Sequence, residues 1–163
     1  MQPHPLPGMH RMKKIDIEKL RIDIVSGKDS ALSLLLSRDG NIGRQGNGTL
    51  PAEHASVQGG SDGSAFQKLL ALLDEQVFAH AAVYDHPHKP GIPITYSIAF
   101  LDSAQHSVVF EFRFGSETAD VGELLPYFDG FITQAVALTD AWYAAEKSRL
   151  DTATDSFAAV KNK

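Results

Sequence analysis

The sequence contains no cysteine, and this absence limits the chemistry that the chain can perform. It excludes disulfide frameworks, thiolate metal sites and cysteine nucleophiles. Long apolar runs are absent too, so none reaches the roughly 20 residues that a membrane-spanning helix needs. Residues 1–14 lack the apolar core of a signal peptide. We therefore expect no association with a membrane and a cytoplasmic location.

Basic residues are fewer than acidic ones: the chain has 15 Lys and Arg against 20 Asp and Glu, which gives a net charge of −5. Binding of nucleic acid is not expected, because contacts to phosphates need a basic surface. The apolar share of 43% in 163 residues is typical of a globular chain that can bury a core. We predict a flexible leader over residues 1–14, a single α+β domain over 15–150 and a frayed tail over 151–163.

The stretch from Ser30 to Leu50 is the most informative part of the chain. Leu32, Leu34 and Leu36 recur with the period of a strand, and Asp39-Gly40 follows directly. Asp-Gly is a strong hairpin signal because the tight turn needs positive φ angles. We predict a hairpin whose arms are residues 31–37 and about 41–46.

An alternative interpretation begins just before that stretch, at Ser26-Gly27-Lys28-Asp29-Ser30. This segment resembles the SGGxDS phosphate-binding loop of the ATP pyrophosphatases, although the second glycine of that pattern is missing here. The resemblance implies a helix after the loop and a nucleotide phosphate held at Gly27 and Lys28. A helix there would have to stop at Gly40 after fewer than three turns. The hairpin is therefore preferred, and a nucleotide-dependent enzyme is the alternative.

The rest of the chain predicts strands and two helices. Residues 15–24 alternate but change phase at Glu18-Lys19, which indicates a β-bulge. A helix is predicted for about 64–73, and a second hairpin joins 94–100 to 108–114. Its aromatic face needs a cover, which the long helix beginning near 122–125 would supply. The predicted fold is α+β, an antiparallel sheet of about five strands with two helices packed on one face.

Two groups of side chains are candidates for binding a ligand. Glycines and polar side chains in the hairpin and the preceding loop could form an anion site, with arginines as bidentate donors. The candidates for this anion site are Arg38, Asn41, Gly43, Arg44, Gly27 and Lys28. Imidazoles beside a carboxylate suit a divalent metal. The candidates for a metal are His86, His88 and Asp85.

No catalytic constellation is visible, since the chain has no nucleophile elbow and its acidic residues are scattered. Trp142 falls on the apolar stripe of the last helix, so Tyr143 is predicted to be exposed and to serve as an interaction anchor. No cofactor is expected. The function that we expect is non-enzymatic binding of a protein partner or self-association. The alternative is an enzyme that uses the Ser26–Ser30 loop or the His86/His88 loop.

Overall fold

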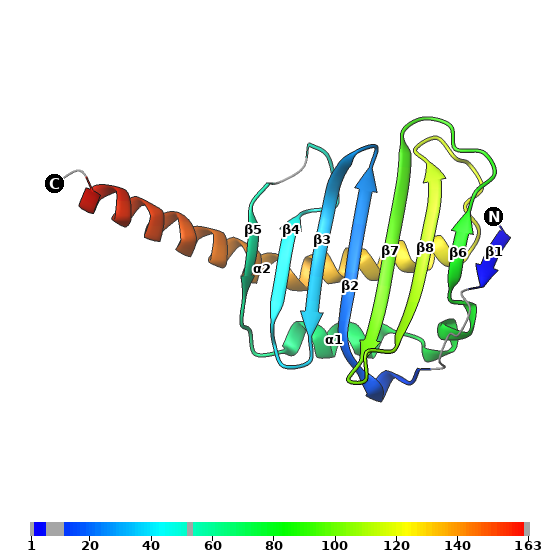
Figure 1. Cartoon of the computed structure of the whole chain (residues 1–163), viewed down its shortest axis with the longest axis horizontal. Helices are drawn as coiled ribbons and strands as arrows, with labels where there is room; N and C mark the ends of the chain where they lie inside the picture. The colour runs from blue at the N-terminus through cyan, green and yellow to red at the C-terminus, as the bar shows by residue number, and fades with distance from the viewer. Residues whose placement is uncertain (1, 6–11, 52–53, 162–163) are drawn as a thin grey trace.

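Two α-helices lie against one face of an eight-stranded sheet (Figure 1). The computed structural model describes residues 2–5, 12–51 and 54–161, with side chains for 12–51 and 54–152. The strands are β1 (Gln2–Pro5), β2 (Ile17–Ser26), β3 (Asp29–Ser37), β4 (Ile42–Gly46), β5 (Ser56–Gly59), β6 (Ala82–Asp85), β7 (Pro93–Asp102) and β8 (Ser107–Gly115). The helices are α1 (Ser64–Leu72) and α2 (Leu124–Lys161), with short 3-10 helices at Lys14–Asp16 and Glu75–His80.

The strand order is β1-β6-β8-β7-β2-β3-β4-β5, and β6 runs parallel to β8. The α+β class is confirmed, but the sheet is larger than the predicted five strands and is mixed rather than antiparallel. The extra strands β1, β5 and β6 have four residues each, the shortest length over which an alternating pattern can be recognised. β6 pairs with the edge of β8 that faces away from β7. This pair is parallel, and the alternating sequence pattern of the β7–β8 hairpin did not indicate it.

The central hairpin is confirmed. β3 and β4 pair antiparallel, with Leu34 opposite Arg44. The turn is held by the Asp39 carboxylate, which accepts a hydrogen bond from the Asn41 backbone N–H (3.0 Å), and Gly40 adopts a φ of +100°. The alternative that this segment forms a helix is wrong, because the segment is a strand with its alternate leucines in the core.

The predicted phase change in β2 is also confirmed. The pairing between β2 and β7 shifts register between Ile17 and Lys19. Because of this bulge, Ile17 and Leu20 are both fully buried although they lie an odd number of positions apart. Ile15, in contrast, lies in a 3-10 helix and is 79% exposed, so it is not part of the strand.

The core lies between the sheet and the two helices. α1 has the predicted position, and its Phe66 and Leu69 are buried. α2 covers the aromatic face of the β7–β8 hairpin as predicted: the ring centroid of Phe128 lies 4.5 Å from that of Phe110. Pro126 is in the first turn of α2, where its missing N–H costs little.

Both ends of the chain hold more regular structure than the leader and tail interpretation implies. Of the predicted leader, residues 1 and 6–11 lie outside the described residues, whereas Gln2–Pro5 form β1 and Met12 is buried in the core. The backbone of residues 151–161 continues α2, and 162–163 lie outside the described residues. Among the described helices, none is long and apolar enough to cross a membrane.

Candidate functional site

The face of the sheet opposite the helices has no secondary-structure element packed on it in the described part of the chain (Figure 1). We call this surface the open face. Strand alternation decides which residues point to it, because the buried side chains point to the helices. The open face of the five central strands and β5 carries Arg21, Asp23, Ser33, Leu35, Gly43, Gln45, Ser56, Gln58, Thr95, Ser97, Ala99, Val109, Glu111 and Arg113.

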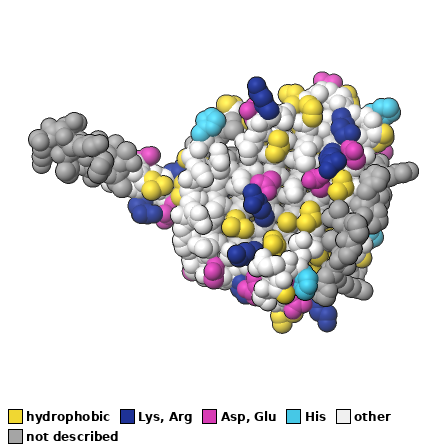
Figure 2. Space-filling model, viewed as in Figure 1, with side chains coloured by type: hydrophobic (Ala, Val, Ile, Leu, Met, Phe, Trp, Pro, Cys, Tyr) yellow, Lys and Arg dark blue, Asp and Glu magenta, His cyan; other side chains and the backbone are white. Residues whose placement is uncertain are grey.

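The charges on the open face are balanced locally. Arg21 Nε lies 2.9 Å from a carboxylate oxygen of Asp23. On β8, Arg113 Nε donates to a carboxylate oxygen of Glu111 at 2.7 Å. Figure 2 views this face and shows basic and acidic side chains next to each other with apolar side chains between them. The charges of these two pairs therefore offset each other within their own strands.

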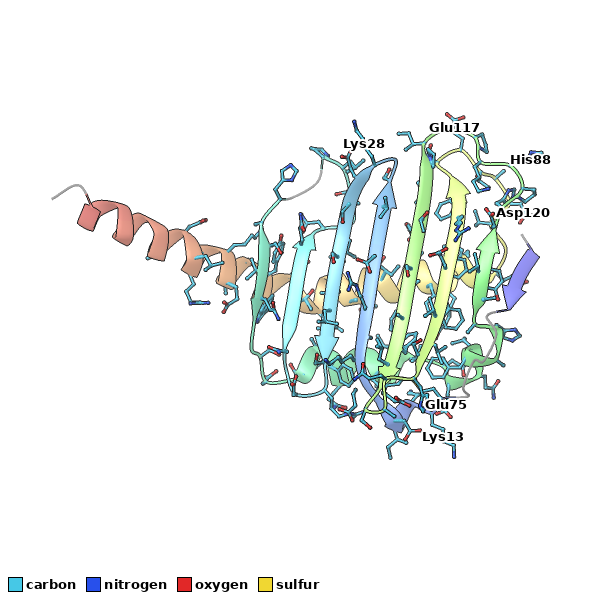
Figure 3. All side chains as sticks on the ribbon, viewed as in Figure 1. Lys13, Lys28, Glu75, His88, Glu117 and Asp120 are labelled. Carbon is cyan, nitrogen blue, oxygen red and sulfur yellow. The ribbon has the colours of Figure 1, made fainter. Side chains whose placement is uncertain are left out.

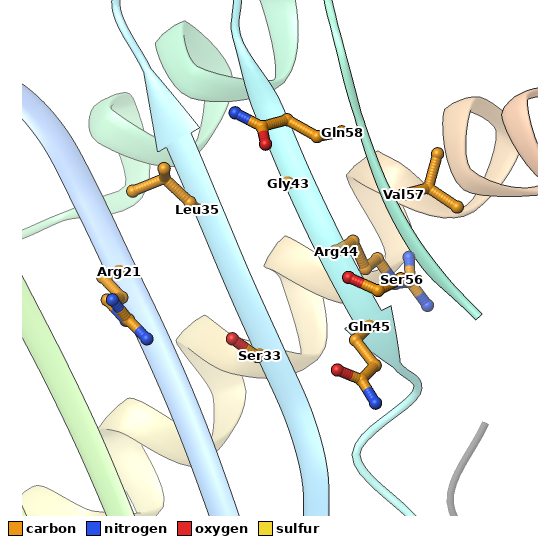
Figure 4. A pocket seen from close by; sticks show the side chains of 9 residues that line it. All are labelled: Arg21, Ser33, Leu35, Gly43, Arg44, Gln45, Ser56, Val57 and Gln58. Carbon is orange, nitrogen blue, oxygen red and sulfur yellow. The ribbon is translucent and has the colours of Figure 1, made fainter. Parts of the chain in front are cut away.

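A shallow depression of about 210 Å³ lies on this face near the β5 edge. It forms because Gly43 has no side chain and lies opposite Leu35 and Gln58 in the neighbouring strands (Figure 4). Ser33, Gln45 and Gln58 contribute hydroxyl and amide groups to its lining. These groups donate and accept hydrogen bonds but carry no charge, whereas Arg21, which also lines the depression, is paired with Asp23.

Arg44, although next to Gly43, extends to the other side of the sheet toward α2 (Figure 4). Its side chain is fully buried, and its guanidinium bonds five acceptors. They are the carbonyl oxygens of Gly46 and Val136, the Thr139 hydroxyl, the Asn47 side chain and the Asp140 carboxylate, at 2.8–3.1 Å. A guanidinium has five N–H groups, so none is left for an anion. Arg44 fastens β4 to α2.

Arg38, the other arginine of the predicted anion site, lies at the opposite end of the hairpin. Its Nη2 donates to the Ile17 carbonyl oxygen at 2.6 Å, and its guanidinium lies over the Phe66 ring. Asn41 is in the adjacent turn, where its backbone amide already bonds Asp39. The structure does not bring the two arginines together, and both hold backbone segments in place.

The prediction that Tyr143 is exposed is wrong. Tyr143 has an exposed fraction of 2%. Its hydroxyl donates to the Ala55 carbonyl oxygen at 2.5 Å and accepts from the Gly46 N–H at 3.1 Å. The Arg44 guanidinium stacks on its ring at 4.4 Å. The prediction continued the apolar stripe of α2 to Trp142 alone. Near β5, α2 also buries the neighbouring tyrosine, whose hydroxyl forms these hydrogen bonds.

The Ser26–Ser30 segment joins β2 to β3 through a tight turn at Gly27-Lys28, and its other residues belong to the two strands. Gly27 has a φ of +63°, and its N–H donates to the Pro93 carbonyl oxygen at 2.7 Å. A strand follows the turn where the resemblance to the ATP pyrophosphatases implies a helix, so no helix N-terminus faces Gly27 or Lys28. Lys28 and the metal candidate His88 lie on separate loops with the β7 end between them (Figure 3).

The His86/His88 loop is organised by its own backbone. His86 Nδ1 accepts a hydrogen bond from the backbone N–H of His88 at 3.1 Å. Asp85 forms an ion pair with Lys89 at 2.6 Å. Within the described residues, no three His, Asp or Glu side chains gather closely enough to hold a metal ion.

A second, more apolar depression of about 240 Å³ lies at the start of α2, beside Tyr96 and Phe114. The Tyr96 hydroxyl donates to Asp129 at 3.2 Å. Burial, together with the negative charge and hydrogen bond of Asp129, raises the pKa of Tyr96 to about 12.

The open face follows from the prediction that both helices pack on one side of the sheet, but its extent was not predicted. Alternation in each strand did identify outward positions, Arg21 and Asp23 among them. The pairing order of the strands, which alternation does not contain, decides that these positions form one continuous surface. Compared with known protein families and curated proteins, the chain matches no family model and no curated sequence.

Proposed function

We propose that the chain is a non-enzymatic binding protein whose open face engages a protein partner. The observation that carries this proposal is the size of the uncovered sheet face. The seven strands from β6 to β5 span about 34 Å at about 4.8 Å per strand. With about 20 Å along the strands, the face offers roughly 700 Å², close to the roughly 800 Å² that each partner contributes to a standard protein interface.

The composition of the face supports a protein rather than a small molecule. Small ligands bind in deep, largely apolar pockets, whereas the depression over Gly43 is shallow and lined by polar groups. Apolar side chains such as Leu35, Ala99 and Val109 alternate with polar ones, as in many non-obligate interfaces. The ion pairs of Arg21 and Arg113 also limit non-specific attraction.

Site-specific photo-crosslinking tests the proposal. A photoreactive residue replaces Ser33, on β3 in the open face, and in a matched variant it replaces Gln67, which is exposed on α1 behind the sheet. In cells, the Ser33 position should form one discrete protein adduct that the Gln67 position does not form. Adducts from Gln67 alone, or none from either position, would contradict the proposal.

A further inference from the structure

The depression at the start of α2 combines aromatic, aliphatic and acidic side chains. Its lining residues come from β7, β8, the segment after β8 and the first two turns of α2: Tyr96, Phe114, Val121, Leu125, Pro126 and Asp129. Tyr96 is two positions from the fully buried Ile98 on the same strand, so both side chains point to the helix side of the sheet. The depression is therefore separate from the open face.

Two aromatic rings form the sheet side of the depression. The ring centroids of Tyr96 and Phe114 are 5.4 Å apart, and the ring planes are inclined at 72°. Both residues are half-buried, so each keeps part of its surface accessible to solvent. The face of an aromatic ring carries partial negative charge and attracts cations. The sheet side of the depression is therefore suited to contact with a cation.

Asp129 adds a full negative charge at the same place. Its carboxylate accepts a hydrogen bond from the Tyr96 hydroxyl at 3.2 Å, which holds it beside the ring. Among the described residues, no Lys or Arg forms an ion pair with Asp129, and the nearest arginine in the sequence, Arg113, bonds Glu111 on the open face. Asp129 lies in the second turn of α2, beyond the first turn where the partial positive charge of a helix start acts. Its charge is therefore available to a ligand.

The chain around the depression is strongly acidic. Residues 114–146 contain six Asp and Glu and neither Lys nor Arg. Five of the six lining residues belong to this segment. The local field therefore attracts an occupant with a net positive charge and disfavours one that carries an anionic group.

The aliphatic part of the lining decides which kind of cation fits. The side chains of Val121, Leu125 and Pro126 offer no hydrogen-bond acceptor, whereas a divalent metal needs several oxygen ligands and a primary ammonium needs acceptors for three N–H groups. A quaternary ammonium group presents methyl groups to aromatic and aliphatic side chains and has no N–H to satisfy. The volume of about 240 Å³ is below the roughly 300–1,000 Å³ of pockets for drug-sized ligands, so the occupant is small.

We propose that this depression binds a small quaternary ammonium cation of the choline type, with its trimethylammonium group against the Tyr96 and Phe114 rings and beside the Asp129 carboxylate. The aromatic and aliphatic side chains contact the methyl groups, and Asp129 offsets the charge. The site does not overlap the open face, so this proposal does not depend on the proposed function.

Titration of the purified chain with choline, followed by NMR through the ring signals of Tyr96 and Phe114, tests the proposal. One comparison ligand is the neutral isostere of choline, in which carbon replaces nitrogen. The other is glycine betaine, which keeps the trimethylammonium group and adds a carboxylate. Choline should shift both ring signals in a saturable manner, and each comparison ligand should bind at least about fivefold more weakly. No saturable shift with choline, or equal affinity for the neutral isostere, would overturn the proposal.

Variants of the chain test the named side chains. Asp129→Asn removes the charge but keeps an oxygen for the Tyr96 hydroxyl, and Phe114→Leu removes one ring but keeps an apolar side chain. Each should raise the dissociation constant of choline about fivefold or more. The matched control is Glu117→Gln, which removes a charge from the same acidic segment outside the lining and should change the constant less than about twofold.

Thermal unfolding shows whether each variant is folded. Asp129 is exposed, so Asp129→Asn should fold as the wild type does and decides the test even if Phe114→Leu does not fold. Equal effects of Asp129→Asn and Glu117→Gln on choline binding would overturn the proposed site. Failure of this site would leave the cross-linking result at Ser33 unaffected, so the two proposals can fail separately.

Discussion

At the scale of single residues, polar side chains buried behind the sheet hold β4, β5 and α2 in register. Arg44 bonds two side chains and the Val136 carbonyl oxygen on α2, while Tyr143 reaches from α2 to Gly46 and Ala55. A buried donor that loses its acceptor costs more than the bond contributed, so these contacts define one arrangement of the helix. That arrangement keeps α2 behind the sheet and leaves the open face uncovered.

Replacing Arg44 should therefore be costly. We expect Arg44→Met to lower the free energy of unfolding by about 2–4 kcal/mol, since a buried, fully bonded charge is lost and its acceptors lose their donor. Arg44→Lys should not restore stability, because an ammonium cannot reproduce the planar fork. Urea unfolding measures the change. Arg21→Met on the open face is the control and should cost under about 0.5 kcal/mol; equal losses would refute this role for Arg44.

Tyr96 gives a prediction in alkaline solution. Its pKa rises from 10.0 to about 12 because burial and Asp129 disfavour the phenolate. Below pH 10 this preference for the neutral form is fully present, and it is lost as the pH rises through about 12. Stability should therefore fall between pH 10 and 12, and Tyr96→Phe should flatten that part of the profile. An identical slope in wild type and variant, measured by chemical denaturation, would argue against the assignment.

At the scale of elements, strong local sequence patterns predicted turns, hairpins and helices. They did not predict which strands pair when those strands are distant in sequence. The Asp39-Gly40 turn, the β7–β8 hairpin and the stripes of α1 and α2 follow from neighbouring residues. β6 pairs with the edge of β8 that faces away from β7, and this pairing depends on contacts between residues that are distant in sequence. The candidate anion and metal residues were chosen by proximity in sequence, but the strands point Gly43 and Arg44 to opposite faces.

The central turn provides a test at this scale. In Gly40→Ala, the new Cβ would lie 2.3 Å from the Ser61 carbonyl oxygen, and the φ of +100° would be strained. We expect a loss of roughly 2 kcal/mol or more in the free energy of unfolding. Gly60→Ala meets no atom within 4 Å and is the matched control, expected to stay within about 0.5 kcal/mol. Similar values for the two variants would mean that the turn is not constrained as described.

At the scale of the whole molecule, the fold has three surfaces of different character. The helices cover one side of the sheet, β5 forms an edge to which no further strand pairs in the described part of the chain, and the open face carries ion pairs within its strands.

The absence of cysteine makes the most direct test simple, because a single introduced thiol can be followed without background. Ser33→Cys and Ser97→Cys place a thiol on the open face, and Gln67→Cys places one on α1. In the purified protein all three thiols should react with a soluble maleimide. In cells, the two open-face thiols should react at least about tenfold more slowly while Gln67→Cys reacts as before, because a bound partner excludes the reagent. Equal labelling of all three positions in cells would contradict the claim that the open face binds a protein.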